Sequence, residues 1–320
     1  MLDILAITTP IFLIIGLGFI AVRAGLFSSV EIRVLGRFVI QFALPAMLFL
    51  TLARSSVAEI LNLRLLFAYL IGSLLAFAVA VTAARFVLGR NSLAAVVVGM
   101  GSSMSNSMFI GLPVVLQVLG PTASLAVAMV VIVENLLMLP LLLAAAETLG
   151  NRDATLWRAL SRTLGRLLRN PMILAISAGF VASLSGLALP APVLKAIDML
   201  ALGSAGISLF VVGGSLAGVV LGGLLGGVAL VSFMKLCVHP LAVLAAVMLV
   251  PGIEPAVRMA AVLFGCMPMF SIYPILSQQY ALEREAAAAL VLTTVVSFFS
   301  ITLWIWVASR SALFPGVDLR

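Results

Sequence analysis

Runs of about 20 apolar residues recur along almost the whole chain, and they constrain its fold more than any other feature. Each run is long enough to cross a bilayer core of about 30 Å as an α-helix. Charged residues make up only 9% of the chain, whereas about 25% is usual in a soluble domain. Such a chain cannot cover itself with polar surface. The sequence therefore predicts an all-α, polytopic membrane protein.

Ten transmembrane helices can be drawn from these runs. Their expected ranges are 5–22, 34–53, 64–88, 95–119, 123–148, 171–188, 197–220, 225–249, 257–280 and 286–308. The first run has no basic segment before it and no small-residue cleavage site after it. We therefore expect a retained helix and not a signal peptide.

The chain is basic, with 18 Lys and Arg against 11 Asp and Glu. A basic chain can indicate nucleic acid binding, but these residues lie mostly in short loops between spans, which is typical of the positive-inside signal. With the N-terminus outside, the cytoplasmic loops hold eleven Lys and Arg, and the opposite loops hold six. Both termini are therefore expected outside, and no nucleic acid partner is expected.

One long polar connection, 149–170, divides the ten spans into five and five. Its arginines recur at helical spacing and predict a basic amphipathic helix on the membrane surface; they are Arg158, Arg162, Arg166 and Arg169. We expect a first repeat over 1–150, a basic cytoplasmic loop over 151–170 and a second repeat over 171–320. Because five is odd, related halves would be inverted relative to one another.

The fourth span of each half is interrupted by helix-breaking and polar residues. The first break is SNSMFIGLP at 105–113, and the second is MPMFSIYPILSQQY at 267–280. Broken helices at corresponding places in two halves are typical of a transporter's binding site. We expect the breaks to face one another and a watery cavity, where lipid does not reach the freed backbone groups. The alternative is two ordinary kinks patched by Ser and Asn side chains.

The candidate substrate-binding residues lie at these breaks. Backbone N–H groups at the start of a half-helix carry partial positive charge, so an anion is their natural ligand. The candidates are Ser103, Ser105, Asn106, Ser107, Gly111, Pro113, Pro268, Ser271 and Tyr273.

Four further polar residues lie inside apolar spans. Glu134 and Asn135 are in the fifth span, where a carboxylate costs at least about 2.5 kcal/mol and is paired, protonated or functional. Lys235 and His239 are four residues apart in the eighth span and share one helical face. Two interpretations stay open: a structural Glu–Lys pair that joins the halves, or a role in proton coupling. His239 is either a proton relay or a packing residue.

Other features favour ordinary structural roles. Glycines repeat every four residues from Gly214 to Gly226, which is typical of close helix packing. Pro45, Pro140 and Pro240 are expected to kink their spans. The two cysteines have no disulfide or zinc spacing. No phosphate loop, nucleophile elbow or pair of catalytic carboxylates is recognisable, so we expect neither an enzyme nor a cofactor.

Three motifs together resemble the auxin efflux carrier family, which joins the plant PIN carriers to bacterial permeases. Asn106 followed by Gly111-Leu112-Pro113 is similar to the N-x-x-x-x-G-x-P of that family's fourth helix. Arg169-Asn170-Pro171 resembles the R-N-P that opens the sixth helix. Pro268 with Tyr280 twelve residues later is similar to the ninth helix. The resemblance covers the whole chain.

The resemblance also has limits. Plant members carry Pro where this chain has Ser105, and their long cytoplasmic loop is reduced here to about 149–170. Both departures favour a bacterial-type permease in the cytoplasmic membrane over a carrier of auxin itself.

The resemblance implies a fold like that of sodium/proton antiporters, with inverted five-helix repeats and crossover helices 4 and 9. It implies a transport domain of helices 3–5 and 8–10 on a scaffold of helices 1, 2, 6 and 7, and a homodimer. It implies organic anion substrates, which are indole-3-acetate in plants and malate or malonate in bacteria.

We therefore expect a secondary transporter of a small mono- or dicarboxylate that works by elevator-type alternating access. The coupling ion, whether proton, sodium or none, stays open. The alternative is a membrane sensor or accessory protein that binds a carboxylate without moving it.

Overall fold

A computed structural model describes residues 2–54, 62–120, 122–150, 169–186, 189–218, 225–310 and 313–317. The described residues are helical, with no β-strand among them. Six of the described helices are long and apolar enough to cross a membrane, and five shorter apolar helices accompany them. The all-helical, multi-pass class is therefore confirmed. The expected amphipathic helix around Arg158 lies outside the described residues.

The first half contains three helices built from consecutive segments, at 29–53, 107–119 and 122–150. Its elements are α1 (Leu2–Arg23), α2 (Ser29–Phe38), η1 (Val39–Ala43), α3 (Leu44–Ala53), α5 (Leu63–Phe86), α6 (Ser92–Ser103), η2 (Ser107–Gly111), α7 (Leu112–Leu119), α8 (Thr122–Ile132), η3 (Val133–Met138) and α9 (Leu139–Gly150). Side-chain caps fix several starts: Ser28 and Glu31 form a capping box for α2, and Asn91 caps α6.

The second half also contains helices built from consecutive segments. Its elements are α11 (Pro171–Ser185), α12 (Ala191–Leu202), α13 (Ser204–Leu216), α14 (Leu225–Phe233), η4 (Met234–Val238), α15 (His239–Leu249), α16 (Pro255–Cys266), α17 (Tyr273–Ser277), η5 (Gln278–Tyr280) and α18 (Glu283–Arg310). Asn170, in the Arg169-Asn170-Pro171 motif, caps α11 through its side chain. Most of these bounds agree with the expected spans to within a few residues.

Four widened turns each lie just before a proline. The turns η1, η2, η3 and η4 end two residues before Pro45, Pro113, Pro140 and Pro240 respectively. Proline has no N–H and its ring crowds the carbonyl four residues earlier, so the helix opens by one residue there. The kinks expected at three of these prolines are thereby confirmed. Wide turns of this kind often occur at functional sites. Glu134 lies in η3 and Lys235 lies in η4.

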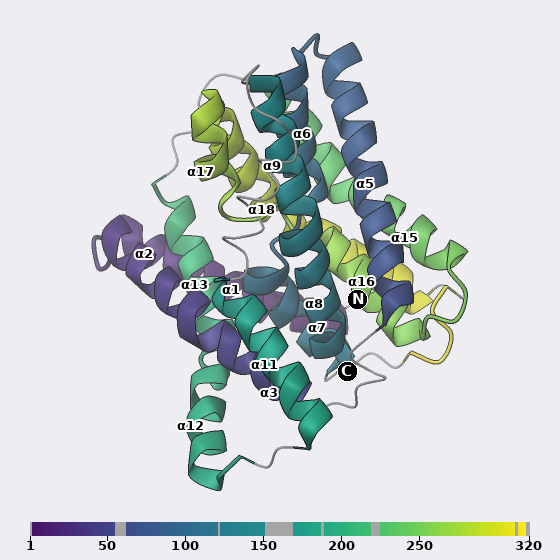
Figure 1. The fold of residues 1–320 in the computed structure, drawn as a ribbon. Coiled ribbons are helices and arrows are strands. Elements are labelled where there is room, and N and C mark those ends of the chain that lie inside the picture. Colours follow the sequence, from purple (N-terminus) through teal and green to yellow (C-terminus); the bar gives the residue numbers. More distant parts are fainter. Residues whose placement is uncertain are drawn as a thin grey trace.

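The helices pack in two groups. In what we call the outer group, α1 and α2 pack on α13, and α3 packs on α11 and α12. In the crossover group, α5 packs on α6 and α15, α8 on α16, and α18 on α14 and α17. Figure 1 shows α5 and α6 beside the continuous column of α8 and α9, with α12 extending away from the body.

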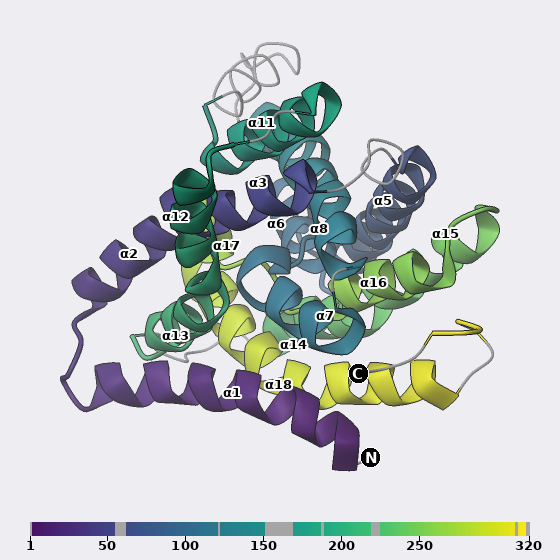
Figure 2. The same ribbon diagram turned by 90° about the horizontal axis from the view of Figure 1, so that it is seen from below.

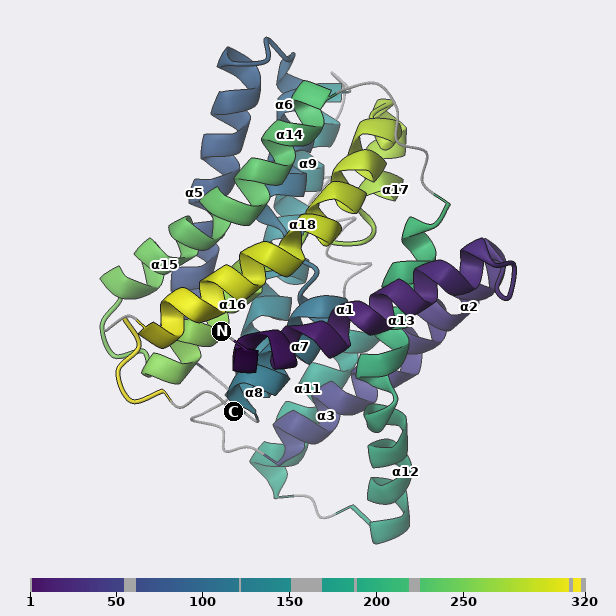
Figure 3. The same ribbon diagram turned by 180° about the vertical axis from the view of Figure 1, so that it is seen from behind.

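The two groups meet along a limited set of elements. α1 contacts α18 and α7, α3 contacts α8, and α13 contacts η2. Figure 2 shows α1 and α18 along one edge of the molecule, and Figure 3 shows α14, α15 and α18 on the opposite side from α3 and α11. α6 lies at the centre, where every residue from Ala94 to Ser103 is buried.

Candidate functional site

The two helix breaks lie side by side in the crossover group. α6 ends at Ser103, α16 ends at Cys266, and in each case the next residue is extended. Ser105 and Met269 then form an antiparallel β-bridge. The backbone N–H of Asn106 donates to the carbonyl of Pro268 at 2.8 Å. The breaks therefore satisfy part of each other's backbone, as expected for irregular chain at membrane depth.

Asn106 joins the two breaks through its side chain as well. Its side-chain amide nitrogen donates to Ser271 Oγ at 2.8 Å. Its backbone carbonyl accepts from the N–H groups of Ile110 and Gly111. The residue is 4% exposed. Asn106 thus starts the second half-helix and is held against the opposite break.

A carboxylate from a neighbouring helix binds the first break. Glu134 in η3 is buried, and its Oε1 accepts from Ser107 Oγ and Tyr69 Oη, both at 2.9 Å. The same oxygen accepts from the backbone N–H of Ser105 at 3.2 Å. Because an ionised carboxylate is an acceptor without a proton of its own, three converging donors suit the charged form.

An ammonium group approaches the same break from the other half of the chain. Lys235 in η4 has no exposed surface, and its Nζ donates to Ser105 Oγ at 2.9 Å and to the carbonyl of Gly265 at 2.8 Å. His239 Nδ1 lies 2.7 Å from the same nitrogen. A lysine ammonium has three donors, so these three partners account for all of them.

The histidine extends this chain of hydrogen bonds to α5. His239 Nε2 lies 3.0 Å from Ser73 Oγ. If Nδ1 accepts from Lys235, the ring proton is on Nε2 and is donated to Ser73. Tyr69 and Ser73 are four residues apart on α5, so the contacts from Tyr69 through Glu134, Ser105, Lys235 and His239 form a closed ring. We call these five residues, together with Ser73, the polar ring.

Glu134 and Lys235 are not in direct contact, because Ser105 lies between them. Among the described residues, the ion pairs within 4.0 Å are Arg54–Asp198 and Arg90–Glu285. Ser105 gives its N–H to Glu134 and accepts from Lys235 through its hydroxyl. The two residues therefore connect through Ser105 and not by a direct ion pair. The choice between a structural role and proton coupling stays a prediction.

Some candidate residues lie outside the polar ring. Ser103 donates to Gly99 and Asn135 donates to Val131, so both side chains are bound within their own helices. Gly111 has a packing role: a Cβ there would lie 2.8 Å from the ring of Phe264. Pro113 is buried near the start of α7.

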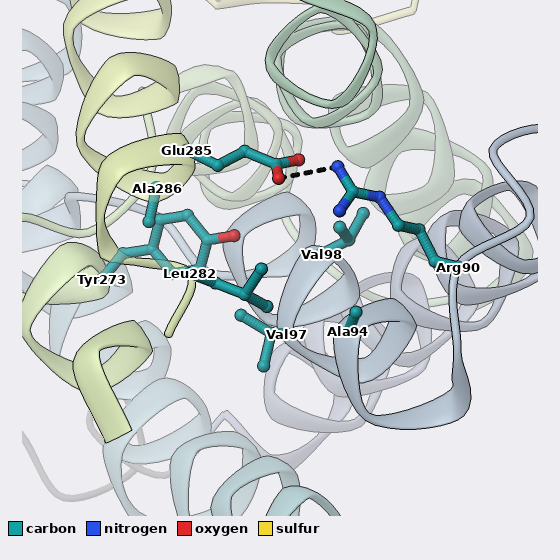
Figure 4. A pocket seen from close by; sticks show the side chains of 8 residues that line it. All are labelled: Arg90, Ala94, Val97, Val98, Tyr273, Leu282, Glu285 and Ala286. Carbon is teal, nitrogen blue, oxygen red and sulfur yellow. Dashed lines mark hydrogen bonds and ion pairs between the residues drawn. The ribbon is translucent and has the colours of Figure 1, made fainter. Parts of the chain in front are cut away.

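Tyr273 lies in a different place, at a small cavity between α6 and α18. Arg90 and Glu285 form an ion pair of 2.7 Å beside it, and Figure 4 shows the ring of Tyr273 directed into the same cavity. Glu285 is 5% exposed and its Oε1 has no hydrogen-bond partner. Gly227 leaves room for this carboxylate, because a Cβ there would collide with Oε1.

Sequence reasoning missed several members of these clusters. Tyr69 and Ser73 are four residues apart and share one face of the third span. The chain has three Tyr residues, so a Tyr inside an apolar span was the signal that could have identified this site. Arg90 was counted only as a loop charge, and Glu285 was not considered. The carbonyl of Gly265 carries no sequence signal. Among the described residues, no group of three or more His, Cys, Asp and Glu could hold a metal ion.

Comparisons with known proteins also indicate membrane transport. A family model described as "Membrane transport protein" matches residues 4–305. A protein of Rhizobium meliloti (strain 1021), named "Putative malonate transporter", is 28% identical over 318 residues, and the alignment covers 98% of each chain.

Proposed function

Because this chain belongs to the membrane transport protein family, that of the auxin efflux carriers, we propose that it is a secondary transporter of a small organic anion. It is a multi-pass membrane transporter and not an enzyme. The observation that carries the finer proposal is the pairing of two broken helices through Asn106, Ser105 and Pro268. Such a pairing supplies polar backbone and side-chain groups at membrane depth.

The first break favours an anion at its half-helix start. The half-helix Ser107–Leu119 begins next to Asn106, and its first N–H groups carry partial positive charge. That charge contributes about 0.3–1 kcal/mol toward an anion at an exposed site and up to about 2 kcal/mol in a partly buried one. The second break contributes less, because α17 has only five residues. Ser107, Ser271 and the Asn106 amide supply further polar groups.

The substrate class follows from this charge and from the relative. The crossover offers one helix start of useful length, and its basic side chain, Lys235, is already hydrogen-bonded. These groups suit one firmly held carboxylate, so a monoanion or a small dicarboxylate fits better than a large polyanion. The similar protein is named for malonate, and we propose the malonate or malate class for this chain. Malonate and malonamide provide a test, because they differ in charge and little in shape. Competition against labelled malonate in proteoliposomes should be effective for the acid only, and equal inhibition by the amide would contradict the proposal.

The packing of the helices supports an elevator movement. The crossover group contains both breaks and the polar ring, and it meets the outer group along few elements. We propose that the crossover group slides past the outer group and carries the anion with it. In this proposal the two groups correspond to a transport domain and a scaffold.

The setting in the membrane is proposed from charge and family resemblance. We propose a homodimer in the bacterial cytoplasmic membrane, with both termini outside. A Ser161→Cys variant should then resist labelling by an impermeant thiol reagent from outside intact cells, and ready labelling would overturn this orientation. Light scattering of the purified protein tests the dimer.

A sensor that binds carboxylates without moving them is the alternative, and counterflow distinguishes the two. Proteoliposomes loaded with unlabelled malonate should accumulate labelled malonate transiently if the protein is a carrier. Binding of malonate without any counterflow would favour the sensor.

A further inference from the structure

A hydrogen bond connects the outer group to the half-helix that follows the first break. Ser208 in α13 has no exposed surface, and its Oγ donates to the backbone carbonyl of Phe109 in η2 at 3.0 Å. The residue four positions after Phe109 is Pro113, which has no N–H, so the ordinary α-helical donor to this carbonyl is missing. Lipid supplies no donor at membrane depth. The outer group therefore supplies the donor that the proline removes.

Ser208 can release this carbonyl and remain hydrogen-bonded. Its Oγ also lies 2.8 Å from the carbonyl of Ala205, one turn earlier in α13. A serine hydroxyl has a single proton, so the two carbonyls share it. If η2 moves away, the hydroxyl turns fully to Ala205. The carbonyl of Phe109, in contrast, needs a new donor in any position to which η2 moves.

The next hydroxyl along α13 is that of Ser204. It is four residues before Ser208, so the two hydroxyls share one helical face and lie about 6 Å apart along the helix axis. Ser204 is 2% exposed, and its hydroxyl donates to Met47 Sδ at 3.4 Å. A thioether sulfur is a weak acceptor, and a methionine side chain is flexible enough to leave. One turn in the other direction the residue is Val212, which has no donor in its side chain.

We propose that Ser208 and Ser204 are two docking positions of the outer group for the moving half-helix. In the described conformation the Phe109 carbonyl binds Ser208. In the opposite conformation η2 has moved one helical turn along α13, and the carbonyl binds Ser204. One-turn steps of one element past another are a known form of conformational switching. This inference rests on the proposed elevator movement, and it adds the length and the direction of the step.

The direction can be related to the membrane. With both termini outside, as proposed, the span Ala191–Leu216 enters from the outer side, so Ser204 lies on the outer side of Ser208. The described conformation is then the inner end of the movement, and the crossover group moves outward to reach Ser204.

The test measures the distance between two spin labels by double electron–electron resonance in proteoliposomes. The labels replace two exposed residues at the proposed inner and outer ends, Leu26 between α1 and α2 and Leu249 at the end of α15. Both native cysteines are replaced by alanine. The protein with both serines should show two distances that differ by about 6 Å, the shorter one belonging to the described conformation.

The two serines should shift the populations in opposite directions. Ser208→Ala removes the donor of the described conformation, so the ratio of long to short distances should rise about fivefold. Ser204→Ala removes the donor of the opposite conformation, and the ratio should fall by a similar factor. Ser215→Ala is the matched control, because Ser215 is on the same helix and donates to Val212 within it. Its ratio should be unchanged.

Each other outcome has a definite meaning. Unchanged ratios in both variants, or shifts in the same direction, would overturn the inference. A single distance both with and without the Ser208→Ala change would also overturn it. Counterflow of labelled malonate by the same labelled protein then tests the proposed function separately, because a carrier without these docking positions would still show counterflow. If Ser208→Ala yields no folded protein, Ser204→Ala against Ser215→Ala is sufficient, since the described conformation keeps its donor in both.

Discussion

Close backbone contacts join α1 and α13 in the outer group, whereas buried hydrogen bonds join the two helix breaks in the crossover group. Where α1 crosses α13, a Cβ at Gly213 would collide with the carbonyl of Ile15, and one at Gly18 would collide with that of Phe210. In the crossover group, Glu134 and Lys235 make three polar contacts each. Their partners come from α5, the first break, η2, α16 and, for His239, the helix that contains Lys235.

The difference follows from the properties of lipid as a solvent. Apolar burial drives helices together only weakly in a bilayer, so close packing of small residues and interhelical hydrogen bonds are the available sources of stability. Glycine contacts are short in range and tolerate no change of spacing. Hydrogen bonds between side chains tolerate small movements and exchange of partners. The outer group is thus suited to a fixed frame, and the crossover group is suited to a moving part.

The largest expected effect comes from filling a backbone contact of the outer group. Gly213→Leu forces α1 away from α13, and we expect a cost of about 3 kcal/mol or more, enough to remove most folded protein. Gly206→Leu is the matched control, because Gly206 is on the same helix, is exposed and has no neighbour within 4 Å of a Cβ. The amount of monodisperse protein in detergent measures both. Equal yields would contradict the glycine contact.

An intermediate effect is expected at the ion pair beside the cavity in Figure 4. Arg90→Ala leaves the buried carboxylate of Glu285 without its partner, and we expect a loss of about 2 kcal/mol, seen as a lower unfolding temperature. Adding Glu285→Gln should recover part of the loss, because the neutral amide is easier to bury. Arg54→Ala is the control, since its pair with Asp198 is 3.7 Å long and exposed, and such pairs contribute little. A similar cost for both arginines would show that burial does not matter here.

The smallest effect is expected within the polar ring. Tyr69→Phe removes one of the three donors to Glu134 Oε1, and we expect a loss of about 1 kcal/mol in the free energy of unfolding. Tyr280→Phe serves as the control, because Tyr280 lies outside the ring at the end of η5. If both variants unfold at the wild-type temperature, the hydroxyl of Tyr69 contributes nothing to the crossover group.

Local patterns in the sequence were enough to predict the breaks. Ser, Asn, Gly and Pro within one apolar span, and Pro268 and Pro274 within another, have no place in an unbroken helix. The position of each break in its half then suggested that the two would meet. The widened turns before Pro45, Pro140 and Pro240 were likewise visible as expected kinks.

Contacts between distant segments were not visible in the same way. Ser105 was a candidate for the substrate site, but nothing in its neighbours predicted that it would join Glu134 to Lys235. Arg90 and Glu285 are 195 residues apart, and each reads as an ordinary charge near a helix end. A buried partner is a property of the packed helices, and a single sequence shows it only when the residue is rare in its setting.

The most direct measurement compares Asn106→Ala with Asn135→Ala in malonate counterflow. Both changes remove a buried or half-buried amide from the crossover group, but Asn106 joins the two breaks, and Asn135 donates only within its own helix. If the paired breaks are the transport site, Asn106→Ala should abolish counterflow while the protein still folds and remains monodisperse in detergent. Asn135→Ala should retain counterflow. Undiminished counterflow by folded Asn106→Ala would contradict a site at the crossover.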